Sequence, residues 1–101
     1  MAEVKVGKLS DFPLNSKKMI TVKGTDIMIT NIDGKLYAIG DVCTHEECSL
    51  SEGILQGNVV TCHCHYGQFD VRTGKVLAAP PQEDEPTYEV KVVGDEIFVV
   101  V

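Results

Sequence analysis

The sequence predicts one all-β domain, a small antiparallel sandwich or barrel, and three observations lead to this prediction. Branched and aliphatic residues gather in short runs of strand length, some of which alternate with polar residues. Turn-forming pairs that contain glycine separate several of these runs at hairpin spacing. No window shows the sustained apolar period of about 3.6 residues that indicates an amphipathic helix. With 101 residues, 44% of them hydrophobic, the chain can bury one modest core and no second one.

The expected elements follow from these signals in chain order. Residues 9–13 can form a single helical turn, because Pro13 ends any helix there. The expected strands are residues 19–23, 26–32, 35–39, 58–61, 68–71, 88–92 and 96–101. The pairs that turn the chain between adjacent strands are Gly24-Thr25, Asp33-Gly34 and Gly94-Asp95. Asp-Gly is among the strongest hairpin signals, since both residues accept the positive φ angles of a type I′ turn.

All four cysteines and all three histidines lie within a stretch of 23 residues, where the strand pattern is interrupted. They are Cys43, His45, Cys48, Cys62, His63, Cys64 and His65. Long loops on a β scaffold usually carry a binding or catalytic site. Because thiols of cytosolic proteins are more often metal ligands or catalytic groups than disulfides, we interpret this stretch as a metal site.

Two tightly spaced pairs in this stretch have the geometry of metal ligands. Cys43 and His45 lie two residues apart, so an extended loop can turn both side chains toward one point. Cys62 and His65 lie three apart, the reach of a tight turn, and sixteen residues separate the two pairs. Two thiolates and two imidazoles suit either tetrahedral Zn²⁺ or a mixed-ligand iron–sulfur centre. Zinc fits the spacing less well, because the chain has no Cys-x-x-Cys knuckle.

Charge and composition exclude several other classes. The net charge of −6 argues against nucleic-acid binding and suits a protein partner with a basic docking surface. The longest apolar run, residues 97–101, is far shorter than the roughly 20 residues of a membrane helix. The N-terminus lacks both a basic start and an apolar signal core, so we expect a cytoplasmic protein without a membrane anchor. In the acidic loop at residues 79–86, the run Glu83-Asp84-Glu85 is expected to be solvated.

At the clustered cysteines and histidines the chain resembles Rieske-type proteins, whose signature is Cys-x-His followed after sixteen residues by Cys-x-x-His. In Rieske [2Fe–2S] centres two histidines replace two cysteines on one of the irons. The resemblance extends to residues 49–53, 67–70, 73–76 and Ala79-Pro80-Pro81. Because it covers about the whole chain, it implies a single Rieske domain over residues 1–101, an antiparallel β sandwich or barrel with a cluster-binding subdomain at about 41–81.

The resemblance also implies a role for each ligand. Cys43 and Cys62 would bind one iron of a single [2Fe–2S] cluster as thiolates, and His45 and His65 would bind the other iron as neutral imidazoles. The two histidines would lie at the tip of the subdomain, with their ring edges near solvent, and so form the gateway for electrons. The proline loop at residues 79–81 would shield the third side of the cluster.

Two further cysteines and two substitutions distinguish this chain within the family it resembles. Cys48 and Cys64 stand where respiratory Rieske proteins carry a disulfide, although many dioxygenase ferredoxins lack both cysteines. The resemblance to the respiratory members therefore implies a Cys48–Cys64 disulfide. The alternative is two buried thiols, which a reducing cytosol would favour. Gly67 and Phe69 replace the Ser and Tyr whose hydroxyls donate to cluster sulfur in respiratory members. We therefore expect a potential in the lower half of the Rieske range, about −150 to +300 mV. His63 fills a non-ligand position and is expected to be exposed.

The function that the resemblance implies is that of a soluble one-electron carrier, which passes electrons from a reductase to an oxygenase or another terminal acceptor. The chain shows no Ser-His-Asp set, no paired acid/base carboxylates and no phosphate-binding glycine loop, so we expect an electron-transfer protein and not an enzyme. One alternative is a small Rieske subunit of a nitrite-reductase-like assembly. Another, from a different class, is a structural zinc module that binds proteins.

Overall fold

The computed structural model describes residues 2–44, 47–64, 66–79 and 81–101, and its regular elements are nearly all strands. In chain order they are β1 (Glu3–Lys8), the 3₁₀ helix η1 (Leu9–Asp11), β2 (Lys17–Val22), β3 (Thr25–Ile32), β4 (Lys35–Gly40), the 3₁₀ helix η2 (Leu50–Glu52), β5 (Ile54–Gln56), β6 (Val59–Thr61), β7 (Gln68–Asp70), β8 (Val76–Ala78), β9 (Thr87–Val93) and β10 (Glu96–Val100). The predicted all-β class is therefore confirmed. No helix among these residues is long and apolar enough to cross a membrane.

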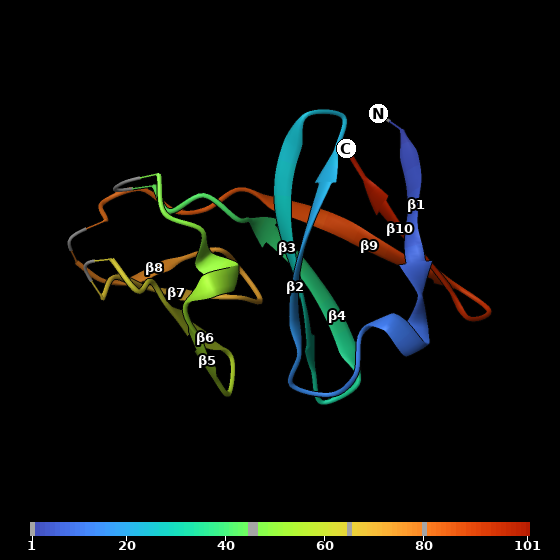
Figure 1. Cartoon of the computed structure of the whole chain (residues 1–101), viewed down its shortest axis with the longest axis horizontal. Helices are drawn as coiled ribbons and strands as arrows, with labels where there is room; N and C mark the ends of the chain where they lie inside the picture. Colours follow the sequence, from blue (N-terminus) through green and yellow to red (C-terminus); the bar gives the residue numbers. More distant parts are fainter. Residues whose placement is uncertain (1, 45–46, 65, 80) are drawn as a thin grey trace.

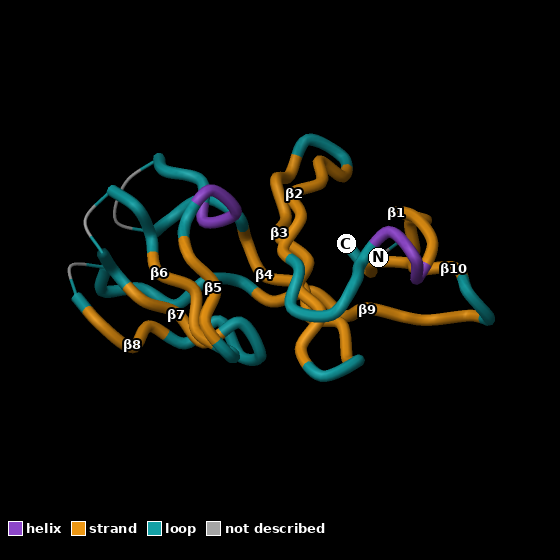
Figure 2. The backbone as a smooth tube through the Cα atoms, turned by 60° about the horizontal axis from the view of Figure 1, so that its bottom comes forward, coloured by secondary structure: helices purple, strands orange, loops and turns teal. Residues whose placement is uncertain are grey.

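The strands form two antiparallel sheets that lie side by side. The larger sheet has the order β1-β10-β9-β4-β3-β2, and the smaller one has the order β5-β6-β7-β8. Figure 1 shows the smaller sheet on the left of the molecule, and Figure 2 shows the same separation from another side. Strands β4 and β9 pair directly, with Ala38 opposite Tyr88 and Ile39 opposite Thr87. The segment between β4 and β9 thus leaves the larger sheet, forms the smaller sheet and returns to the larger one.

Each sheet has its own buried cluster, and β3 contributes to both. Ile27 and Ile29 pack in the core of the larger sheet, whereas Met28 packs in the core of the smaller one. Because successive side chains of a strand point to opposite faces, one face of β3 packs in the core of the larger sheet and the other packs in the core of the smaller sheet. The remaining buried hydrophobic residues of the smaller core are Ile39, Cys43, Leu50, Val60, Cys62, Phe69 and Val71. The clustered cysteines therefore lie against a packed apolar region.

The sequence-predicted strands are confirmed to within one or two residues at each end, and the helical turn at residues 9–13 is η1. Three strands were not predicted: β1, β5 and β8. In β1 the alternation of Val4 and Val6 ends at Gly7, and the pairing with β10 shifts register between Lys5 and Gly7. Strands β5 and β8 have only three residues each, too few to show an alternating pattern.

Candidate metal centre

The two predicted cysteine ligands lie just beyond the ends of strands that border the smaller core. Cys43 follows β4 and Cys62 follows β6. Both side chains are buried, with 5% and 2% exposure, and both pack in the core of the smaller sheet. The Cys43 amide donates to the Cys48 carbonyl at 2.9 Å, and the Cys62 amide donates to the Gly67 carbonyl at 2.8 Å. Two folded loops thus direct two thiols into one apolar region.

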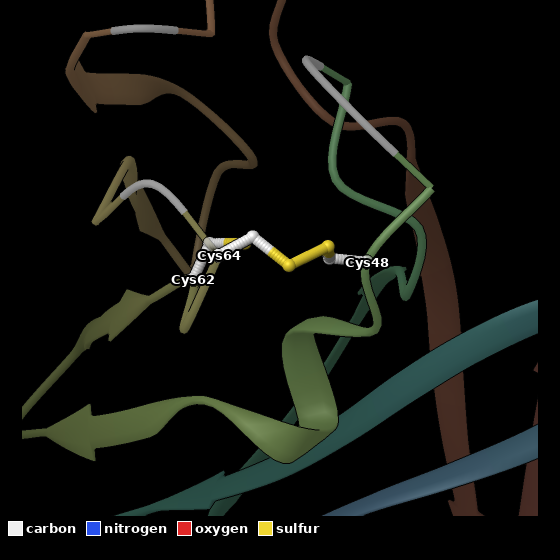
Figure 3. Close-up of side chains that lie close together, drawn as sticks. All are labelled: Cys48, Cys62 and Cys64. Atoms are coloured by element: carbon white, nitrogen blue, oxygen red, sulfur yellow. A yellow bond between two sulfur atoms is a disulfide. The ribbon is translucent and has the colours of Figure 1, made fainter.

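A disulfide between Cys48 and Cys64 joins the two loops, with the Cα atoms 6.5 Å apart. This is the pairing that the resemblance to respiratory Rieske proteins implies. The sulfurs of Cys48, Cys62 and Cys64 lie within 4.8 Å of one another, and Figure 3 shows the disulfide reaching across beside Cys62. Because a metal ligand must be a thiolate, the two sulfurs of the disulfide are not available to a metal. Cys62 is therefore the ligand candidate in this trio.

The predicted ligands His45 and His65 lie outside the residues that the structure describes, and so does Pro80 of the proline loop. Their roles stay predictions. His63, which matches no ligand position, is exposed as expected. Its Nε2 atom lies 3.8 Å from the Sγ atom of Cys64, a contact at the edge of the disulfide.

A buried carboxylate, Asp41, holds the loop that carries Cys43. The Asp41 side chain is 2% exposed, and it accepts hydrogen bonds from the Ser49 hydroxyl and, at 2.9 Å, from the Ser51 amide. Its backbone carbonyl accepts from the Leu50 amide at 2.6 Å. The loop is thus closed at its base on both sides of Cys43 and Cys48. Sequence reasoning missed this role, because an Asp beside a cysteine is not by itself a signal of a loop anchor.

Residues 81–84 of the acidic loop contact both of the loops that carry the predicted cysteine ligands. A Cβ atom added at Gly67 would lie 2.4 Å from the Cδ atom of Pro81, so this glycine is required for the close approach of the proline ring. On the other side, the Thr44 hydroxyl donates to the Glu83 carbonyl at 2.7 Å. The Val76 amide donates to the Asp84 carboxylate at 2.9 Å, which fixes the loop to β8. Three segments far apart in the sequence therefore meet around the cysteines.

The expectation that the whole run Glu83-Asp84-Glu85 is solvated is wrong for its last residue. Glu83 and Asp84 are exposed, but Glu85 is 4% exposed, because its amide donates to the Gly74 carbonyl at 2.7 Å and draws the chain inward. Its Oε2 atom is buried with no hydrogen-bond partner in the described part of the chain. Burial raises the pKa of Glu85 to about 8, the negative charge of Asp41 adds to this effect, and a hydrogen bond from the Thr44 amide opposes it.

The residues present fit a Rieske-type [2Fe–2S] centre in two respects. Cys43 and Cys62 are two buried thiols on two loops that the disulfide holds together, and two thiols are what the cysteine-bound iron of such a centre requires. Both pack in the buried apolar core of the smaller sheet, an environment that suits a redox centre. Phe69 is fully buried in the core of the smaller sheet, and Gly67 lies against Pro81.

The fold and this site define a small β domain in which two buried thiols lie on two loops that a disulfide joins. Comparison with known proteins specifies the family, because the profile of the Rieske [2Fe-2S] domain matches residues 2–89. The chain belongs to this family. A Rieske domain implies a [2Fe–2S] cluster.

The similar proteins include several ferredoxins of dioxygenase systems. The chain is 38% identical over 100 residues to the biphenyl dioxygenase ferredoxin subunit of Pseudomonas sp. strain KKS102, covering 98% of this chain and 92% of that one. It is 34% identical over 91 residues to the naphthalene 1,2-dioxygenase ferredoxin component of Pseudomonas aeruginosa, covering 90% and 88%. Among solved structures, the ferredoxin of carbazole 1,9a-dioxygenase from Nocardioides aromaticivorans IC177 superposes with a TM-score of 0.93 at 32% identity, covering 98% and 97%. A further match, at a TM-score of 0.91 and 33% identity over 96% and 91%, is a complex of oxygenase and ferredoxin in carbazole 1,9a-dioxygenase.

Proposed function

We propose that this protein is a one-electron carrier, which takes electrons from a reductase through one [2Fe–2S] cluster per chain and delivers them to a ring-hydroxylating oxygenase. The observation that carries the proposal is the pair of buried thiols, Cys43 and Cys62, on two crosslinked loops. The similarity to ferredoxin components over nearly the whole chain supports the acceptor class. One observed complex pairs such a ferredoxin with its oxygenase.

In this proposal Cys43 and Cys62 bind one iron, and His45 and His65 bind the other. When bound, the cluster accepts and releases one electron at a time. The chain's own residues hold the two ligand loops in register, exclude water from the thiols and place Pro81 against the loop that follows Cys62. The proposed domain covers residues 1–101, with the cluster-binding subdomain at about 41–81; the position of that segment between β4 and β9 supports this division.

The charge distribution supports partners with a basic docking surface. The segment from Leu36 to Val71, which includes all the proposed ligands, contains no Lys or Arg. A basic patch on the reductase and on the oxygenase would therefore be attracted to this end of the molecule, and the encounter rate would fall with ionic strength. We place the protein in the cytoplasm, where a reductase would have access to it.

Metal and sulfide analysis of the purified protein tests the proposed cofactor. We expect about two irons and two sulfides per chain, the composition of one [2Fe–2S] cluster. Cys43→Ser, Cys62→Ser, His45→Ala and His65→Ala should each lose or remodel the cluster, whereas His63→Ala, the matched control, should keep it. A colourless protein with one zinc per chain, or normal iron content and an unchanged spectrum in Cys43→Ser or His65→Ala, would overturn the assignment.

Electron delivery is tested separately with a defined acceptor. The reduced protein is mixed with the oxygenase component of the biphenyl dioxygenase system of Pseudomonas sp. strain KKS102, biphenyl and oxygen, and the hydroxylated product is measured. We expect product formation that depends on the cluster. Its absence in the presence of an intact, reducible cluster would reject a ring-hydroxylating oxygenase of this class as the acceptor.

A further inference from the structure

The backbone of Tyr66 adopts a conformation that a tyrosine rarely takes. Four non-glycine residues in the described part of the chain have positive φ angles: Asn15, Lys23, Asp33 and Tyr66. Asn15 and Asp33 are residue types that tolerate this region, because their short polar side chains bond locally. Tyr66 is a bulky aromatic with φ 61°, so its backbone is strained.

The turn that contains Tyr66 requires this conformation. The Tyr66 amide donates to the Cys62 carbonyl at 3.0 Å, and the Cys62 amide donates to the Gly67 carbonyl at 2.8 Å. Both backbone groups of Cys62 therefore hydrogen-bond to the end of the turn. A residue in the left-handed region is what such a closure needs, and glycine meets that need without strain. The neighbouring glycine is already required elsewhere, since a Cβ atom at Gly67 would clash with Pro81.

The side chain of Tyr66 gains little burial in return for this strain. It is 73% exposed, the highest value among the large hydrophobic side chains that the structure describes. Folding therefore does not explain a tyrosine at this position, and glycine would serve the turn better. Strained residues at functional sites commonly serve the function and not the fold.

We propose that the Tyr66 ring is an apolar anchor that inserts into a pocket on the oxygenase partner, with basic residues of that partner around the pocket. This inference rests on the proposed function. Tyrosine is enriched among the few side chains that dominate protein interfaces, because it offers a large rigid surface and a polar end. Tyr66 follows the proposed ligand His65 directly, so an anchor here would dock the partner next to the electron gateway.

The acidic side chains around this turn indicate the charge of the partner. Glu47 is exposed and adjoins Cys48, which the disulfide joins to the loop of Tyr66. Glu83 is exposed on the segment that packs on this loop through Pro81. The turn therefore lies among segments that carry exposed acids, and this arrangement matches an interface with an apolar centre and a charged rim.

The test compares the holoprotein with Tyr66→Gly and Tyr66→Phe in steady-state turnover by the biphenyl dioxygenase oxygenase of strain KKS102, with the reductase of that system in excess as the electron donor and the ferredoxin concentration varied. Iron content and thermal unfolding are measured on the same preparations. Two controls lie on the segment between η1 and β2: Asn15→Gly also places glycine at a positive φ, and Leu14→Ala also removes exposed apolar surface, since Leu14 is 65% exposed.

We expect Tyr66→Gly to keep its two irons and to unfold at the wild-type temperature or a few degrees above it, because strain is relieved. At the same time its KM for the oxygenase should rise roughly tenfold, as for loss of an interface anchor, with kcat nearly unchanged. Tyr66→Phe should retain most of the affinity, and both controls should leave KM unchanged. If wild type supports turnover and Tyr66→Gly has the same KM, the anchor is rejected while the proposed function stands. If wild type with an intact cluster supports none, the proposed function fails, and the anchor fails with it.

Discussion

The Cys48–Cys64 disulfide should contribute a large share of the free energy of unfolding. The two residues are 16 apart in sequence. Closing a loop of about this length lowers the entropy of the unfolded chain and stabilises the fold by about 3 kcal/mol in the loop-closure model. The cluster does not replace this constraint, because the unfolded chain is expected to lose its metal. For a domain of this size, about 3 kcal/mol corresponds to a fall in Tm of roughly 12 °C or more.

The assay is thermal unfolding of the holoprotein, followed by circular dichroism and by visible absorbance, for wild type and for the Cys48→Ala/Cys64→Ala double variant. Alanine avoids the polar hydroxyl that serine would place at two half-buried positions. Wild type treated with a thiol reductant serves as the control and should shift toward the double variant. Equal Tm values for oxidised wild type and the double variant, or two alkylatable thiols at Cys48 and Cys64 in the untreated protein, would refute the reasoning.

Three further predictions test the neighbouring contacts. Asp41→Ala removes an acceptor of two loop hydrogen bonds and should lower the free energy of unfolding by about 2–3 kcal/mol in urea titration, whereas Glu89→Ala, at an exposed acid, should change it little. Gly67→Ala brings a Cβ atom within 2.4 Å of the Pro81 ring and should destabilise by about 1–3 kcal/mol in the same titration. Burial raises the pKa of Glu85 from 4.5 to about 8, so the folded state keeps a proton that the unfolded state releases, and stability should fall as pH rises through this interval. Glu85→Gln should flatten that fall in Tm measured from pH 5 to 8; an equal slope in wild type and variant would contradict the assignment.

The strands that the sequence predicted are those whose signals, a hairpin pair or an alternating run, lie within a short window of sequence. The hairpin pairs Asp33-Gly34 and Gly94-Asp95 connect runs long enough to show their burial pattern, and both connect paired strands in the structure. β1 was missed because Gly7 interrupts its pattern, and it is held by pairing with β10, more than 80 positions away in the chain. A contact of that separation leaves no trace in a short window of sequence.

The residues of the candidate site also divide into those that a local sequence signal predicts and those that depend on distant contacts. Cysteine and histidine spacing is a local signal that predicts the candidate ligands, and the disulfide partners followed from the resemblance to respiratory Rieske proteins. Asp41 and Glu85 were not, because their roles depend on contacts that spacing does not encode. Glu85 is buried through a hydrogen bond to Gly74 and packs beside Gly40, where a Cβ atom would meet its carboxyl oxygen at 2.6 Å. From composition alone, an acid in an acidic loop is expected to be solvated.

The redox potential is the property that links these local features to the proposed function. Hydrogen bonds to cluster sulfur stabilise the more negative reduced state and raise the potential. Phe69 is fully buried and carries no hydroxyl, Gly67 has no side chain, and no Lys or Arg occurs from Leu36 to Val71. Each of these features leaves the added electron less stabilised, so we expect a midpoint in the lower half of the range of about −150 to +300 mV. Protein-film voltammetry at neutral pH measures this value. A midpoint in the upper half would mean that donors other than side-chain hydroxyls at positions 67 and 69 determine the potential.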